Sequence, residues 1–438
     1  MRKLKHALTN LAIGLGVALL LALWMALPWQ GALVALALLG VWLAASRGGR
    51  LTWLATRLGL ASLPQRWGAS LVIVIGIAGV VGVLVAMLAM GEGFATTLKG
   101  TGSDKSAILL RGGSQAETNS VITRDQAVLV GGLPGIARDD EGRPLVSPEI
   151  SQVVNLPSKA DGSDANVQMR GIGPAGWKVR PRLRIVRGRA FTPGKRELVV
   201  GQGVTGQFRG VEIGQTLVFA HQPWEVVGVF ASGDAHDSEL WTDAETLSGA
   251  SRYKIWQSIS VGLDGRDGLA RLKAALAADP RLKLDAETTR HYYGKQSERL
   301  KKLLDILGRV IGTIMAIGAV FGALNSMYAA VAGRAREIAT LRAIGFRGGP
   351  VVMAVMLETM LLAAAGGVLG AGLAWLVFNG YSVSTLGENF SQVVFQFHVS
   401  PSLLWTGLKW ALGIGLVGGL FPALRAARMP VTEALRAV

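Results

Sequence analysis

The chain contains 438 residues, half of them apolar, and it carries a formal net charge of +16. The apolar residues form long blocks flanked by lysine and arginine, without any helix-turn-helix, zinc or RNA-binding signature, so membrane topology explains the charge better than nucleic-acid binding. The absence of cysteine from the sequence excludes disulfides and cysteine catalysis, and an exported domain must therefore fold by packing alone.

Two apolar runs begin the chain, and we expect them to form an N-terminal transmembrane hairpin within residues 1–50. The first run, 11–27, follows a basic start and is alternatively a signal peptide. The second run, 32–45, is short for a span, which needs about 20 residues. The following segment, 51–67, mixes leucines with arginines, which favours a helix lying in the membrane interface, with an ordinary loop as the alternative.

A third apolar run, 68–91, is predicted to cross the membrane and to lead into a soluble α+β domain at residues 92–302. Polar loops containing proline separate short alternating segments in this domain. Its last part, 291–304, has a polar helical pattern, and we expect it to extend the next span outward as a stalk. The predicted strands are 107–111, 167–170, 197–200, 216–220 and 225–230, and the predicted helices are 126–132 and 269–278.

Residues 303–438 are predicted to contain three further spans, the first two at 306–331 and 351–378. Pairs of glycines four residues apart recur in them, and small residues let helices approach closely in lipid. The pattern predicts close contact with a second subunit, or alternatively tight packing within one chain. The glycines are Gly308, Gly312, Gly318, Gly322, Gly366, Gly370, Gly415 and Gly419.

The orientation follows from the basic clusters near the N-terminus and at 47–66, 334–347 and 425–436, which all fall on one side of the predicted membrane. The loop at 379–400 contains no lysine or arginine and falls on the other side. The sequence thus predicts an α-helical polytopic membrane protein with about six spans and an inserted α+β extracytoplasmic domain. Both termini are expected in the cytoplasm.

The segment 334–346, between two of these spans, is charged and helix-prone. Ile338, Leu341 and Ile344 recur at three-residue steps, a spacing that indicates an apolar stripe, and Gly345 is a plausible C-cap. Such a helix is suited to dock into a groove of a cytoplasmic partner, and a loop that only fixes topology is the alternative. The charged residues of the segment are Arg334, Arg336, Glu337 and Arg342.

Polar residues at membrane depth are candidates for function. Asn325 is placed to form an interhelical hydrogen bond, Glu358 to pair with arginines of the 334–346 segment, and Lys409 to reach toward the outer surface. These groups are isolated and do not form a proton relay.

No other pattern predicts catalysis or metal binding. The sequence Gly-Gln-Gly-Val-Thr-Gly at 201–206 matches a dinucleotide fingerprint in letters, but we expect a turn, because no amphipathic helix follows. His236, Asp237 and Glu239 lack the spacing of a metal site, and a solvated loop is favoured. No P-loop or nucleophile elbow occurs in the 438 residues, so the chain is not expected to be an enzyme.

Segments 334–346, 421–428 and 433–436 together resemble the FtsX-like permease family of ABC transporters, which includes the MacB and lipoprotein-releasing permeases. The segments 170–174, 188–191, 197–201, 214–216 and 226–229 resemble the periplasmic core domain of MacB-like permeases. The resemblance implies that 334–346 is a coupling helix resting on an ATPase.

The resemblance further implies a permease subunit of a bacterial inner-membrane ABC transporter, with ATP and Mg bound by a partner ATPase. It would move its periplasmic domain by mechanotransmission to export or release hydrophobic, peptide or lipoprotein substrates. Expected partners are a second copy or paralogue, membrane lipid and a periplasmic adaptor. An alternative is an FtsX-type scaffold that regulates a cell-wall hydrolase. The N-terminal hairpin and the sequence Gly-Gly-Pro at 348–350 depart from the family pattern.

Overall fold

The computed structural model describes residues 16–251, 254–387 and 391–429, which form two compact units. The first, here called the helical unit, comprises the described residues of the ranges Met1–Met90, Leu303–Asn379 and His398–Val438. The second, the head, comprises Gly91–Lys302 and Gly380–Phe397. The basic start of the first apolar run and the C-terminal segment 433–436 lie outside the described residues.

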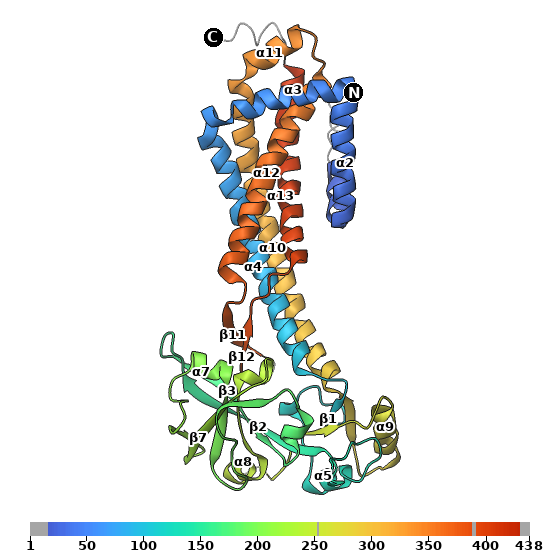
Figure 1. Ribbon diagram of the computed structural model, residues 1–438, viewed down its shortest axis with the longest axis vertical. Coiled ribbons are helices and arrows are strands. Elements are labelled where there is room, and N and C mark those ends of the chain that lie inside the picture. The colour runs from blue at the N-terminus through green and yellow to red at the C-terminus, as the bar shows by residue number, and fades with distance from the viewer. Residues whose placement is uncertain (1–15, 252–253, 388–390, 430–438) are drawn as a thin grey trace, which may run out of the picture. The chain divides into compact units, whose positions relative to one another are not determined.

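The helical unit contains the long apolar helices expected from the sequence (Figure 1). Within the described ranges, four segments are long and apolar enough to cross a membrane: Leu63–Thr101, Thr289–Gly333, Gly348–Phe378 and Pro401–Arg428. The elements of this unit, two of which continue into the head, are α2 (Trp29–Ala45), α3 (Arg47–Ala61), η1 (Leu63–Arg66), α4 (Trp67–Thr101), α10 (Thr289–Gly333), α11 (Ala335–Ala343), α12 (Gly348–Phe378) and α13 (Pro401–Arg428).

The predicted number of about six spans is not confirmed. The N-terminal segments Gly16–Ala26 and Trp29–Ala45 are helical but bend by 120° at the break between them, so they count together as at most one further span among the described residues. The helix Trp29–Ala45 has 17 residues, fewer than the roughly 20 that a straight crossing needs. Pro28 lies at the bend, where its ring and missing N–H prevent one continuous helix.

The head is built on a mixed ten-stranded sheet with the order β10-β1-β9-β2-β3-β8-β5-β7-β4, and β6 pairs with β7. Most neighbours are antiparallel, whereas β3 with β8 and β5 with β7 are parallel. The strands are β1 (Ser106–Arg111), β2 (Val146–Pro157), β3 (Asp164–Ile172), β4 (Arg184–Gly188), β5 (Glu197–Gly201), β6 (Thr216–Phe219), β7 (Gln222–Ala231), β8 (Glu239–Asp243), β9 (Ser258–Gly262) and β10 (Leu284–Thr288).

Short helices connect these strands, and alternate strand residues point into one large apolar core. Each of the five predicted strands and both predicted helices corresponds to an element of the structure, whereas β2, β4, β8, β9 and β10 were not predicted. The helices are η2 (Glu117–Asn119), α5 (Arg124–Val130), α6 (Gly176–Val179), α7 (Gln202–Gln207), η3 (Ala235–Ser238), α8 (Ala244–Ala250) and α9 (Gly268–Ala278).

The segment between α12 and α13 also contributes to the head. It forms a hairpin of β11 (Ser382–Leu386) and β12 (Gln392–Gln396). The Val394 amide donates a hydrogen bond of 2.7 Å to Ser238 Oγ, and the ring of Phe395 lies 5.5 Å from that of Phe94. A stretch that the sequence presented only as an uncharged loop is therefore part of the second unit.

Candidate functional site

The predicted coupling segment forms α11, a helix of nine residues. It begins after Arg334, whose backbone leaves the helical region, and it ends at Ala343, two residues before Gly345, where φ is +107°. The Phe346 amide donates to the Leu341 carbonyl, and the Gly345 amide donates to the Arg342 carbonyl. This is a Schellman termination, which favours glycine because an L side chain strains the left-handed backbone.

The three residues of the predicted apolar stripe, Ile338, Leu341 and Ile344, differ in how far they are exposed. Ile338 is buried in its own chain with 5% of its surface exposed, Leu341 is half-buried, and Ile344 is 70% exposed. Arg336 and Glu337 are exposed beside it. A partner can therefore contact Ile344 and the charged side, whereas Ile338 anchors the helix from within, because one face of a short helix must pack to hold it in place.

Glu358 ties α11 to two other elements. This residue of α12 is 3% exposed, and its carboxylate accepts hydrogen bonds from Arg66 Nη2 at 2.9 Å and Arg334 Nη1 at 3.1 Å. Arg334 Nε also donates to Glu337 at 2.9 Å. An added Cβ at Gly59 would lie 2.7 Å from Glu358 Oε2, so glycine is needed for this approach of α3. The expected pairing of Glu358 with an arginine of the segment is present. We call these four charged residues the Glu358 cluster.

The two other polar residues predicted at membrane depth lie apart from this cluster. Lys409 Nζ donates to the Met25 carbonyl at 2.8 Å, and Trp24 Nε1 donates to the Lys409 carbonyl at 2.9 Å. Lys409 therefore binds the end of the first helix, where the free carbonyls carry partial negative charge. Asn325 is exposed on α10.

The eight glycines fall into two groups. An added Cβ on six of them would lie 3.3 Å or less from another helix of the same chain, so these six serve internal packing. Gly318 and Gly322 have nothing within 4 Å and lie on α10 near Ile317 and Phe321, which are 55% and 67% exposed. Contact with a second subunit stays a prediction for this pair. The internal group is Gly308, Gly312, Gly366, Gly370, Gly415 and Gly419.

The head contains a buried charge network that the sequence did not reveal. All five N–H donors of Arg170, which is 1% exposed, bind carboxylates of Glu117, Glu149 and Glu239 at 2.8–3.0 Å. Arg180 binds Glu149 through two more bonds, of 2.7 and 2.8 Å. Burial acts to raise the pKa of Glu149, but Arg180 and Arg170 outweigh it and lower that pKa. Burial also acts to raise the pKa of Glu239, but its charged partners, chiefly Arg170, outweigh burial and lower that pKa.

The solvated loop expected around His236 is wrong. His236 and Glu239 are 2% and 7% exposed, and the imidazole Nδ1 lies 3.3 Å from Glu239 Oε2. The turn expected at 201–206 is also wrong, because α7 begins directly after β5. Gly201 and Gly203 make room for η3, since a Cβ on either would collide with the Asp237 carbonyl.

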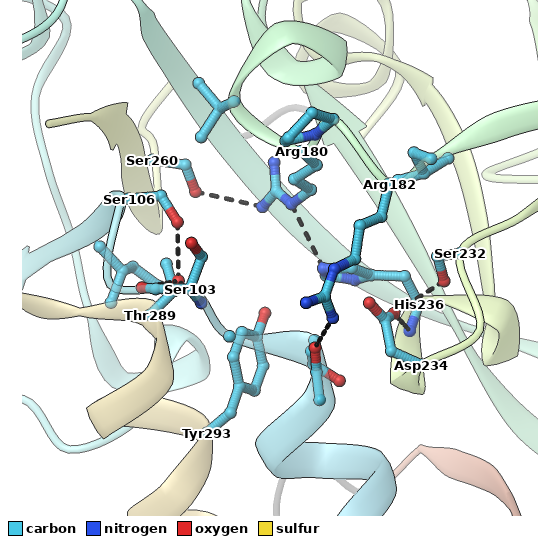
Figure 2. A pocket seen from close by; sticks show the side chains of 17 residues that line it. Ser103, Ser106, Arg180, Arg182, Ser232, Asp234, His236, Ser260, Thr289 and Tyr293 are labelled. Carbon is cyan, nitrogen blue, oxygen red and sulfur yellow. Dashed lines mark hydrogen bonds between the residues drawn. The ribbon is translucent and has the colours of Figure 1, made fainter.

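A small pocket of about 70 Å³ lies beside this network, lined by the ends of α4 and α10 that enter the head and by the segments 179–183 and 232–236 (Figure 2). Its side chains bind one another: Arg180 Nε donates to His236 at 3.3 Å, and Ser106 and Thr289 share a hydrogen bond of 2.8 Å. Among the described residues, no group of histidine and acidic side chains is placed to hold a metal ion.

The four long apolar helices and the head inserted between α4 and α10 define an integral membrane protein with one large hydrophilic domain. Residues 70–279 match the family model of the MacB-like periplasmic core domain, and residues 309–431 match that of the FtsX-like permease C-terminal region. The two matches together take in more than half of the chain. It belongs to the FtsX-like permease family of ABC transporters, with a MacB-like periplasmic core domain.

Individual relatives agree with this assignment. The ABC transporter permease YknZ of Bacillus subtilis is 23% identical over 87% of this chain and 98% of its own length. The macrolide export ATP-binding/permease protein MacB of Vibrio parahaemolyticus is 24% identical over 66% of this chain and 45% of its own. The chain thus spans about half the length of the MacB relatives that it matches.

Two solved structures of extracytoplasmic domains are also similar. The periplasmic region of MacB from Actinobacillus actinomycetemcomitans matches 44% of this chain and 92% of its own at 16% identity, with a TM-score of 0.34. The extracellular domain of YknZ from Gram-positive bacteria matches 42% of this chain and 98% of its own at 19% identity, with a TM-score of 0.32.

Proposed function

We propose that this chain is the permease subunit of an ABC transporter that α11 couples to a separate cytoplasmic ATPase. ATP hydrolysis would move the head and so export or release a hydrophobic, peptide or lipoprotein substrate. The proposal rests on one observation above all: α11 is anchored by buried Ile338 and the Glu358 cluster, while Ile344 next to it is exposed. A surface that must transmit force needs both a rigid attachment and a free contact.

Continuous helices support the transmission step. Both α4 and α10 contain residues of the helical unit and of the head, without a break in helical structure. A displacement at the α11 end of α10 can therefore reach the head through a hydrogen-bonded rod. The 438 residues contain no P-loop, and we assign the binding of ATP and Mg to the partner ATPase.

The partners follow from the same reasoning. A second copy or paralogue would pack on the exposed side of α10 around Gly318 and Gly322, where helix backbones can approach closely. We place the chain in a bacterial inner membrane with α11 in the cytoplasm and the head outside. A periplasmic adaptor would contact the head.

The test replaces Ile344 with aspartate. Burial of an isoleucine contributes about 1.5–3 kcal/mol, and a buried carboxylate without a partner costs more, so ATPase binding should weaken at least about tenfold. Tagged chain is purified from its host membranes in mild detergent, and ATP hydrolysis in the eluate is measured. The matched control is Val128→Asp in the head, where the side chain is 78% exposed. Equal ATPase activity in the wild type and Ile344→Asp would remove the docking role.

A further inference from the structure

The helical unit carries most of the excess positive charge of the chain. Its sequence contains sixteen lysines and arginines but only four aspartates and glutamates. No acidic residue at all precedes Glu92. The basic residues in the N-terminal part of this unit therefore have few carboxylates with which to pair.

The helix α3 lies across the ends of the long helices, near α11 (Figure 1). Ser46 caps its start by accepting a hydrogen bond of 2.8 Å from the Gly49 amide. One side of the helix is buried, against α2 at its start and against α12 beyond it. This side consists of small residues, which allow the helices to pack closely: Gly49, Thr52, Ala55, Thr56 and Gly59.

The other side of α3 presents arginines. Arg47, Arg50 and Arg57 are exposed, and none of them has an ion-pair partner among the residues that the structure describes. Arg66, only one turn beyond the helix, is different, because it turns inward to Glu358. Three guanidinium groups thus lie on one surface with no carboxylate paired to them in the described part of the chain.

Apolar side chains share this outer surface. Trp53 is 48% exposed and lies between Arg50 and Arg57 at helical spacing. Leu54 and Leu58, one turn apart, are 51% and 53% exposed. Arginine, tryptophan and leucine side by side on a helix that crosses the ends of the long apolar helices fit the boundary between headgroups and acyl chains. A soluble acidic protein would leave the leucines in water, whereas a lipid surface accepts both kinds of side chain.

We propose that the outer side of α3 binds anionic phospholipids of the cytoplasmic leaflet. Arg47, Arg50 and Arg57 hold the headgroup phosphates, while Leu54 and Leu58 enter the acyl region. The Glu358 cluster gives this binding a consequence for coupling, since Arg66 in η1, which follows α3, and Arg334 at the start of α11 bind the same carboxylate. That consequence rests on the proposed function, but the lipid binding does not.

The experiment uses the full chain in lipid nanodiscs, without any ATPase. Discs of phosphatidylcholine alone are compared with discs of phosphatidylcholine and phosphatidylglycerol in equal amounts, and hydrogen exchange is followed at the amides of 47–61. Phosphatidylglycerol should slow this exchange at low salt, and high salt should reverse the effect. The enrichment of bound phosphatidylglycerol is measured by native mass spectrometry. Each arginine should contribute about fivefold to that binding.

The variant Arg47→Gln/Arg50→Gln/Arg57→Gln should lose about a hundredfold in phosphatidylglycerol binding. The matched control, Arg47→Lys/Arg50→Lys/Arg57→Lys, keeps the charge and should bind as the wild type does. Single substitution of Arg57 by glutamine, expected to cost fivefold, serves if the triple variant does not fold. The proposal would be overturned if the glutamine variants bound phosphatidylglycerol as strongly as the wild type does. It would also be overturned if discs of phosphatidylcholine alone protected the amides of 47–61 equally well. Glutamine variants that keep lipid binding and lose only ATPase co-purification would overturn it too, because the arginines would then bind the ATPase.

Discussion

Removal of the Arg170 side chain should destabilise the head strongly. Arg170→Met keeps much of the side-chain length but leaves Glu117 and Glu239 without their arginine and Glu149 with Arg180 alone. Loss of one partner from a buried ion pair costs about 3–5 kcal/mol, because the remaining charge stays buried without compensation. With three carboxylates affected, we expect the upper part of that range.

The assay is hydrogen exchange of the full chain in detergent. The amides of β2, β3 and β8, which carry Glu149, Arg170 and Glu239, should open about a thousandfold to several thousandfold more often. The matched control is Arg124→Met, because Arg124 also makes two bonds to a single carboxylate but is 46% exposed. An exposed pair contributes about 1 kcal/mol or less. If the two variants had the same effect, the reasoning that burial makes the Arg170 network costly to break would be refuted.

Three further perturbations test other contacts. The pKa of Glu197 falls to about 2 because Arg189 donates two hydrogen bonds to it, so this contribution to stability is present above pH 4.5 and is lost as the pH falls toward 2. As the pH is lowered, the β5 amides of Arg189→Gln should lose their protection from hydrogen exchange at a higher pH than those of the wild type. If both proteins lost protection at the same pH, the pairing would be contradicted. Glu358→Gln should speed exchange in α11 by releasing Arg334, and unaltered exchange would exclude an anchoring role. Lys409→Met should expose the N-terminal helix to limited proteolysis, whereas equal cleavage would show that the contact is dispensable.

The elements that could be predicted from the sequence are those with a local signal. Long apolar runs indicated α4, α10, α12 and α13, and alternation indicated β1, β3, β5, β6 and β7. The end of α11 was predictable from Gly345, because a left-handed backbone at a helix end favours glycine. The sequence of the β11–β12 hairpin was too similar to that of a polar loop for the two strands to be predicted.

The parts that could not be predicted depend on partners distant in sequence. Arg170 meets Glu149 and Glu239 only because β2, β3 and β8 are neighbours in the sheet, and strand order is not encoded in local pattern. Ile338 and Ile344 belong to the same predicted stripe, yet only the tertiary structure decides which one packs inward. Periodicity identifies an apolar face but does not say whether its own chain or a partner covers that face.

The central claim is that α11 and the head lie on opposite sides of the membrane, so that force can pass between them. The chain contains no cysteine, so a single introduced cysteine reports its own position without background. Ser163→Cys in the head and Ala343→Cys in α11 are both at exposed positions. In intact spheroplasts, a membrane-impermeant maleimide should label Ser163→Cys at once and Ala343→Cys only after lysis. Labelling of both variants before lysis would place the two sites on the same side and contradict the account.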